Sequence, residues 1–330
     1  MEKIKYNHRF ILGITLVSAM GGLLFGYDWV VIGGAKPFYE RFFDIASSPY
    51  LQGWAMSSAL IGCLFGAMFS GWFSDRYGRK LPLIMAALLF TMAALGTGMA
   101  NQFTVFIIYR LIGGLGIGLA SAISPMYIAE ISPASIRGRL VSVNQLTIVI
   151  GILAAQFINF LIAEKIPAGA TDLQILQSWN GQMGWRWMFW AGTVPALAFF
   201  ILAFFIPESP RFLAKSGKWD GSLKILERIG GREYALQEQK NIAGTLDESD
   251  AKVDWKALTA KKVRPMLILG IVLAVFQQWC GINVIFNYAE EIFTSAGYSV
   301  GDMLFNIVIT GTVNLVFTVL AMRMVDSWGR

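Results

Sequence analysis

Gly71–Lys80 reads GWFSDRYGRK, and the chain carries a second form of the same stretch, MVDSWGR, at Met324–Arg330. Each copy follows a long apolar segment and combines charged residues with a glycine, which is typical of a short turn between two membrane helices. The two aspartates, Asp75 and Asp326, are too far apart for a solenoid repeat, whose period is roughly 20–50 residues. The duplicated turn therefore predicts a protein built from two related halves.

The composition identifies a membrane protein. Of the 330 residues, 55% are hydrophobic and 15% are charged, whereas soluble domains average about 45–50% and about 25%. The excess lies in runs that reach the roughly 20 residues needed to cross a bilayer. We predict eight membrane helices, at 10–35, 51–73, 81–100, 103–129, 140–163, 187–206, 266–290 and 303–324.

The net charge of +6 follows the topology of these helices. Basic residues gather before the first helix and in every second connection, whereas the alternate connections hold few. This positive-inside pattern predicts a multi-pass protein of the cytoplasmic (inner) membrane with its N-terminus in the cytoplasm, and no nucleic acid is needed to explain the charge. The basic residues that depart from the pattern are Lys36, Arg41, Lys165 and Arg186.

Three domains are expected in an all-α chain. Residues 1–207 form a six-helix bundle, 208–264 form a cytoplasmic linker, and 265–330 begin a second bundle. In the linker, Trp219–Ile229 and Glu233–Leu246 have apolar residues at helical spacing, which favours two amphipathic helices over a disordered segment.

The position of the repeated turn predicts how many helices the complete fold has. Its first copy joins the second and third helices, so its second copy should join the eighth and ninth. Eight of twelve expected helices are therefore in view, and we expect the function to belong to a longer protein. Two parallel six-helix repeats, with substrate held between them near the midplane of the bilayer, describe one large class of secondary transporter.

Two ionisable residues lie inside apolar segments. Asp28 is eight residues before Lys36, and Arg110 is nine after Asn101. At 1.5 Å per residue, both side chains lie roughly 12–14 Å below the outer boundary, so they can form an ion pair. A buried carboxylate costs about 2.5–3.5 kcal/mol on insertion scales. The pair is therefore either a proton switch, in which protonation of Asp28 releases Arg110, or a fixed structural contact.

The seventh predicted helix carries Gln277, Gln278 and Asn283. Amides inside a membrane are costly unless they face a cavity or a neighbouring helix. Since an amide both donates and accepts, such a cluster suits the hydroxyl groups of a sugar, although hydrogen bonds between helices would also satisfy it. Further candidates of the same kind are Gln145 and Asn314, with apolar faces for a sugar ring from Phe25, Trp279 and Tyr288.

Other classes of function find little support in the sequence. The single histidine, His8, lies in the polar N-terminal arm, and both Cys63 and Cys280 lie in predicted helices. Neither a metal site nor a catalytic constellation is expected, and the chain is predicted to be no enzyme and to need no cofactor. The glycine-rich run Gly113–Gly118 lies inside an apolar helix with no preceding strand, which favours helix packing over nucleotide binding.

An ordered set of motifs makes the chain similar to the sugar porter family of the major facilitator superfamily, and most of all to its bacterial xylose–proton symporters. The likeness covers essentially the whole sequence. The motifs are Gly26-Tyr27-Asp28, Asp75 to Lys80, Pro125 to Glu130, Arg137-Gly138-Arg139, Pro207 to Arg211, Gln277 to Asn283, and Asp326 to Arg330.

This resemblance implies a role for each matching residue. Asp28 matches the proton-coupling aspartate and Arg110 its partner. The expected sugar-binding residues are Phe25, Gln145, Gln277, Gln278, Asn283 and Asn314. The expected cytoplasmic gating network consists of Asp75, Arg79, Glu130, Arg137, Arg139, Glu208, Arg211 and Asp326. One departure is Ser327, which stands where the first copy of the turn has Arg76.

The implied function is uptake of a monosaccharide, xylose or a hexose, by proton symport through alternating access. The expected partners are the sugar, the proton and the lipid bilayer, and the complete protein is expected to act as a monomer. Facilitative relatives tend to lack a carboxylate at the position of Asp28, so this residue favours symport. A facilitative uniporter and a non-transporting sugar receptor are the alternatives.

Overall fold

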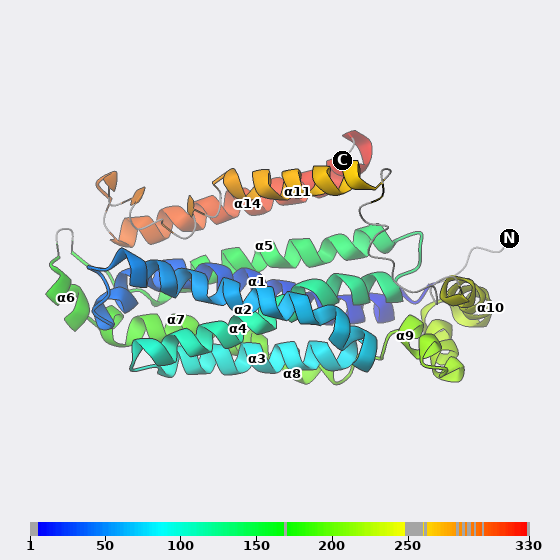
Figure 1. Cartoon of the computed structure of the whole chain (residues 1–330). Helices are drawn as coiled ribbons and strands as arrows, with labels where there is room; N and C mark the ends of the chain where they lie inside the picture. Colours follow the sequence, from blue (N-terminus) through cyan, green and yellow to red (C-terminus); the bar gives the residue numbers. More distant parts are fainter. Residues whose placement is uncertain are drawn as a thin grey trace.

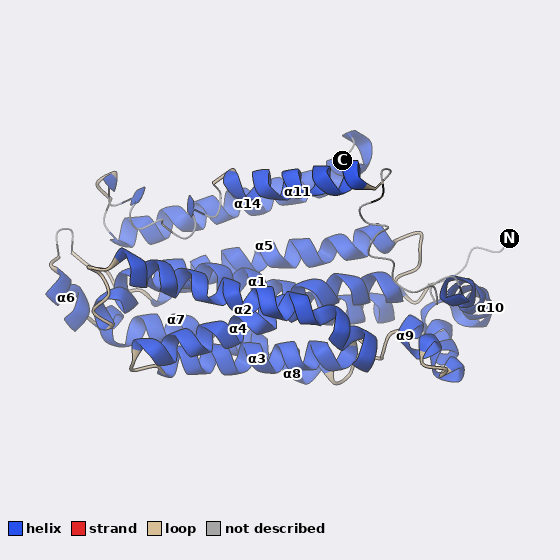
Figure 2. Cartoon of the chain, in the orientation of Figure 1, coloured by secondary structure: helices blue, strands red, loops and turns tan. Residues whose placement is uncertain are grey.

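Long helices that run side by side form the body of the molecule (Figure 1). The computed structural model describes residues 6–167, 170–247, 260, 263–281, 284–285, 288, 292–293, 295–298 and 300–328, and the regular secondary structure of these residues is helical throughout (Figure 2). The helices are α1 (His8–Phe42), α2 (Pro49–Tyr77), α3 (Lys80–Met99), α4 (Phe103–Ile131), α5 (Arg137–Ile162), α6 (Asp172–Gln177), the π-helix η1 (Asn180–Gly184), α7 (Trp185–Ala191), α8 (Thr193–Ala203), α9 (Pro210–Lys215), α10 (Trp219–Asp247), α11 (Arg264–Trp279) and α14 (Val300–Trp328).

Seven spans in the described part of the chain are long and apolar enough to cross a membrane. Six correspond to the first six predicted helices, the sixth being the continuous run Asn180–Ala203 of η1, α7 and α8, and the seventh span is Asp302–Met324. The all-α membrane class is thus confirmed. The helices alternate in direction, so the start of α1, the α2–α3 turn and α9–α10 share one end of the bundle (Figure 1).

The predicted helix at 266–290 is not continuous. α11 has 16 residues and ends at Trp279, and Gly281 follows with φ +86°. This left-handed conformation favours glycine and ends a helix. Beyond the break, the backbone N–H of Tyr288 donates to Val284 O at 2.8 Å, which marks a separate helical turn.

Glycines bring the helices of the first bundle into contact. A Cβ on Gly26 of α1 would collide with the backbone oxygen of Ile148 in α5, and one on Gly151 would collide with that of Leu23. The α2–α4 crossing repeats this arrangement, since Gly62 faces Leu111 O. Backbone contact of this kind is how small residues associate helices in lipid. The packing interpretation of the glycine-rich run is confirmed, because Gly114 and Gly118 meet α2 in the same way.

The linker contains the two predicted amphipathic helices. α10 bends at Gly231, whose φ is +81°, and so divides into two helical parts. Apolar side chains from both parts form a buried cluster with Ile11 of α1, and the backbone N–H of Asn7 donates to Ile229 O at 2.8 Å. The helical prediction is thus confirmed for Trp219–Ile229 and Glu233–Leu246, and the chain at 219–247 is not a disordered linker.

Arg186, one of the exceptions to the charge pattern, is a buried structural residue. Its guanidinium donates to Gly98 O at 2.7 Å, Ala100 O at 2.8 Å and Asn101 Oδ1 at 2.9 Å. It also lies 4.7 Å from the ring centroid of Phe42. The residue therefore ties the α3–α4 connection to the sixth span instead of marking a cytoplasmic loop.

Arg186→Lys should destabilise the protein by about 2–3 kcal/mol, because an ammonium cannot serve these carbonyls in the planar geometry of a guanidinium and leaves buried acceptors unpaired. Thermal unfolding in detergent measures the effect. Arg76→Lys is the matched control, since Arg76 is exposed and lies 5.8 Å from the Trp72 ring centroid. Equal stability of the two variants would contradict the structural role of Arg186.

Candidate functional site

Asp28 and Arg110 form an ion pair inside the bundle. Arg110 Nη1 lies 2.8 Å from both carboxylate oxygens of Asp28, which joins α1 to α4. The Arg110 side chain is 3% exposed and that of Asp28 is 18% exposed. The predicted contact is therefore present. The depth argument that led to it was wrong in one respect, because Lys36 is buried within α1, which continues to Phe42, and does not mark the outer boundary.

Apolar groups surround much of the pair. Arg110 Nε has no hydrogen-bond partner among the described residues, and the ring of Phe189 lies 6.0 Å from the guanidinium carbon. A small apolar cavity that includes Leu24 and Phe90 borders Asp28 on another side. Removing one partner of a buried ion pair costs about 3–5 kcal/mol. Neutralising Asp28 would thus leave Arg110 as an uncompensated charge and favour a conformation in which it is solvated.

Arg110 also lines a cavity of about 260 Å³ between the first bundle and the segment that begins in α11. The opposite wall consists of Gln278, Val284 and Tyr288. The remaining lining residues come from α1 and α2: Trp29, Ile32, Gly53, Met56, Ser57 and Leu60. The arrangement puts an amide, a phenol and an indole next to the charged pair, a mixture of polar and aromatic groups that suits a sugar.

The structure brings together only part of the predicted sugar-binding set. Gln278 is the one predicted amide that shares the described cavity with Arg110. Gln145 and Gln277 are exposed and Asn314 is half-buried, while the Phe25 ring contacts that of Trp29, with centroids 6.3 Å apart. Asn283 lies outside the described residues.

Sequence reasoning missed two polar or aromatic residues that line the cavity, Trp29 and Ser57. Trp29 directly follows Asp28, so its position beside an intramembrane carboxylate was a usable signal. Ser57 offered no such signal, because a serine in an apolar helix commonly bonds its own backbone, as Ser58 does to Ala55 O at 3.1 Å. Its place in the cavity depends on the packing of α2 against α4.

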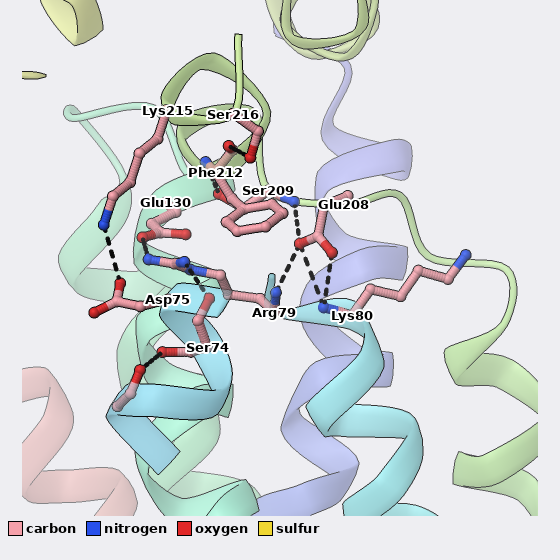
Figure 3. Close-up of polar contacts among 11 residues, drawn as sticks. Ser74, Asp75, Arg79, Lys80, Glu130, Glu208, Ser209, Phe212, Lys215 and Ser216 are labelled. Carbon is pink, nitrogen blue, oxygen red and sulfur yellow. Dashed lines mark hydrogen bonds and ion pairs between the residues drawn. The ribbon is translucent and has the colours of Figure 1, made fainter. Parts of the chain in front are cut away.

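A second polar cluster joins the α2–α3 turn to α4 and to the start of the linker (Figure 3). Arg79 Nη2 lies 2.8 Å from Glu130 Oε1, and both side chains are about nine-tenths buried. Glu208 Oε1 accepts from the backbone N–H groups of Arg79 at 2.8 Å and Ser209 at 2.7 Å. Gly78 has φ +85°, and the Glu208 carboxylate occupies the space that a Cβ there would need.

The remaining members of the predicted cytoplasmic network differ in their contacts. Lys215 Nζ lies 3.3 Å from Asp75 Oδ1 in an exposed pair, and Arg137 donates to Ser132 O at 3.3 Å. Arg139 and Arg211 are exposed and form no ion pair with described residues. The side chain of Asp326 lies outside the described part of the chain.

Glu208→Ala should destabilise the protein by about 2–3 kcal/mol, because the change leaves the N–H groups at the start of α3 without their charged acceptor. Thermal unfolding in detergent would detect the loss. Glu227→Gln serves as control, since its pair with Arg232 is 3.9 Å long and the arginine is 80% exposed. Surface pairs of that kind contribute at most about 1 kcal/mol. A Glu208 variant as stable as the control would rule out the capping role.

The chain is similar to known sugar transporters. A family model described as "Sugar (and other) transporter" matches residues 14–330. The D-xylose-proton symporter of Escherichia coli strain K12 is 39% identical, and the match covers 99% of this chain and 69% of that protein. The arabinose-proton symporter of Bacillus subtilis strain 168 is 40% identical, with 97% and 67% covered.

Solved structures agree with these matches. The proton:xylose symporter XylE bound to 6-bromo-6-deoxy-D-glucose superposes with a TM-score of 0.85 at 38% identity, covering 98% of this chain and 71% of that one. A partially occluded inward-open structure of XylE from E. coli gives a TM-score of 0.83, with 97% and 74% covered. The fold is therefore shared along almost the whole of this chain.

Proposed function

Because this chain belongs to the sugar transporter family of the major facilitator superfamily, we propose that the protein carries a monosaccharide across the cytoplasmic membrane by proton symport with alternating access. The family and the relatives named above are transporters and not enzymes, and the apolar helices make the chain a multi-pass membrane protein. The observation that carries the proposal is the buried Asp28–Arg110 pair, whose arginine lines a cavity next to Gln278.

The proton step uses this pair. With Asp28 charged, the carboxylate neutralises Arg110 and holds α1 against α4. With Asp28 protonated, Arg110 loses its counter-charge, and the cost of a buried unpaired cation favours the alternative conformation. Because Arg110 faces the sugar cavity, a bound sugar and the proton state influence the same side chain. This shared residue supplies the coupling free energy that symport requires.

The substrate follows from the chemistry of the cavity and from the relatives. Amide and aromatic groups suit a neutral polyhydroxyl ligand, and the similar proteins are named for xylose, arabinose and glucose. We infer a pentose or hexose that binds between Trp29, Gln278 and the neighbouring residues. The rest of the predicted sugar-binding set is proposed to contact the sugar in conformations in which the two helical bundles lie closer together. These residues are Phe25, Gln145, Gln277, Asn283 and Asn314.

The cytoplasmic network would hold one of the two transport states. Arg79, Glu130 and Glu208 join α2, α3, α4 and the start of the linker, so separation of these elements would break the contacts together. The end of the bundle that carries this network also carries most of the basic residues, which supports a cytoplasmic N-terminus. In the other transport state, the network is proposed to include the remaining predicted gating residues, which are Asp75, Arg137, Arg139, Arg211 and Asp326.

The test is transport in proteoliposomes with the protein at its full natural length. Labelled D-xylose, L-arabinose, D-glucose and D-galactose are compared in counterflow, which needs only exchange, and in accumulation driven by an imposed pH gradient. Symport predicts both activities for at least one sugar. Counterflow without accumulation would indicate a uniporter, and sugar binding with neither activity would indicate a receptor.

A further inference from the structure

A second buried charge lies further along α1. Lys36 is 1% exposed, although it belongs to the membrane-spanning segment His8–Phe42. It follows Asp28 by eight residues, or about 12 Å along the helix axis. A desolvated ammonium requires compensation from its neighbours. Nothing in the proton step proposed above uses this residue, so its role needs a separate explanation.

Among the contacts of the Lys36 ammonium are two with described residues of different chemistry. Glu40, one turn further on, places Oε1 at 3.8 Å from Nζ. This exceeds the roughly 2.7–2.9 Å of a charge-assisted hydrogen bond. The ring of Tyr288 lies closer to an optimal position, with its centroid 4.8 Å from Nζ, within the roughly 6 Å of a cation–π contact. The tyrosine is thus a direct partner of the buried cation.

Tyr288 also forms part of the wall of the cavity that contains Arg110 and Gln278. It lies beyond the break at Gly281, in a helical turn that α11 does not continue. That turn needs contacts of its own to keep its position against the first bundle. The cation–π contact is one such contact, and it joins residues 252 positions apart.

We propose that Lys36 is a positioning residue that holds the Tyr288 ring in the wall of the sugar cavity, and that sugar affinity depends on its charge. The inference rests on the proposed function for the identity of the ligand. The contact itself can be tested without a sugar. A purely structural reading, in which Lys36 only neutralises Glu40, predicts no dependence on the aromatic ring.

The variants test separately the charge of Lys36, the aromatic ring of Tyr288 and the hydroxyl of Tyr288. Lys36→Met alone would remove the ammonium that lies 3.8 Å from the buried Glu40 carboxylate, so the double variant Lys36→Met with Glu40→Gln removes both charges of this contact together. Tyr288→Leu removes the ring, Tyr288→Phe keeps the ring without its hydroxyl, and Lys36→Arg keeps the positive charge. The concentration of labelled D-xylose or D-glucose that half-saturates counterflow is measured for each variant, together with the maximal exchange rate.

The double variant and Tyr288→Leu should each raise the half-saturating concentration by roughly 5- to 30-fold, the range that a cation–π contact supports. Combining them should add little, because both remove the same contact. Lys36→Arg should stay close to wild type, and Tyr288→Phe should lose less affinity than Tyr288→Leu. An unchanged affinity in the double variant, or equal losses in Tyr288→Phe and Tyr288→Leu, would overturn the assignment.

A spin-label measurement tests the contact independently of transport. Labels are placed at Ser47 and Ala296, both exposed, after Cys63→Ser and Cys280→Ser remove the thiols of residues 1–330 and any further cysteine of the full-length protein is replaced by serine. The distance distribution should broaden in the double variant and in Tyr288→Leu, and should stay narrow in Tyr288→Phe. An unchanged distribution in the double variant would refute the positioning role. Broadening in a protein that exchanges no monosaccharide would support the role and refute the proposed function.

Discussion

Asp28→Asn should abolish accumulation of sugar driven by a pH gradient while leaving counterflow within a few-fold of wild type. For one-to-one coupling, each pH unit supplies about 1.4 kcal/mol, enough for about tenfold accumulation. Asparagine has nearly the same shape as aspartate but cannot exchange a proton, so the variant should equilibrate the sugar without concentrating it. The amide oxygen can still accept a hydrogen bond from Arg110, which preserves the geometry needed for exchange.

The matched control is Asp172→Asn. Asp172 also pairs with an arginine, Arg41, with a 2.8 Å contact, but its side chain is 76% exposed. Loss of this exposed pair should leave both activities unchanged. Accumulation that survives Asp28→Asn would disprove the assignment of Asp28 to proton coupling. Loss of both counterflow and accumulation would instead assign the residue to structure.

Gly26→Ala should prevent recovery of a folded, monodisperse protein, or lower its stability by at least about 3 kcal/mol. The added methyl group would meet the backbone oxygen of Ile148, and the reciprocal Gly151 position prevents α5 from shifting aside. Backbone cannot change rotamer, so the cost exceeds the roughly 1–3 kcal/mol of ordinary overpacking. Size-exclusion chromatography and thermal unfolding in detergent measure the result.

Gly13→Ala provides the comparison on the same helix. Nothing lies within 4 Å of a Cβ built at Gly13, and alanine has the higher helix propensity. This change should be neutral or slightly stabilising. If Gly26→Ala behaves like Gly13→Ala, α1 and α5 do not cross as closely as described.

Local patterns in the sequence were sufficient for the first bundle. The lengths of the apolar runs located its helices, and the distribution of basic residues predicted which helix ends face the cytoplasm. The two intramembrane charges were correctly expected to pair. The glycine spacing between α2 and α4 was likewise understood as packing. Each of these features follows from the bilayer, which penalises exposed backbone and unpaired charge wherever they occur.

Features that depend on contacts between distant residues were harder to predict. Lys36 was taken as a boundary residue, because nothing near it in sequence indicates that Tyr288 lies over its ammonium. Arg186 was counted as an exception to a charge rule, although carbonyls 86 and 88 positions away bind it. The break after Trp279 was missed because Gly281 resembles other glycines of apolar helices until its φ is known.

The candidate sugar site shows the same limit. Amides inside apolar helices and the family resemblance both indicated its polar residues, but of these amides the described cavity includes only Gln278 beside Arg110. Trp29 and Ser57 line that cavity because α1 and α2 both pack against α4, which residue type alone does not reveal. Single motifs therefore predict the chemistry of such a site better than they predict which side chains meet in one conformation.

Sugar-induced proton movement tests the central claim most directly. Proteoliposomes that contain the full-length protein and no imposed gradient are given labelled sugar outside, and the external pH is recorded. The account predicts alkalinisation of the medium that follows sugar entry and is lost in Asp28→Asn. Sugar entry at the wild-type rate with no change in external pH would contradict it.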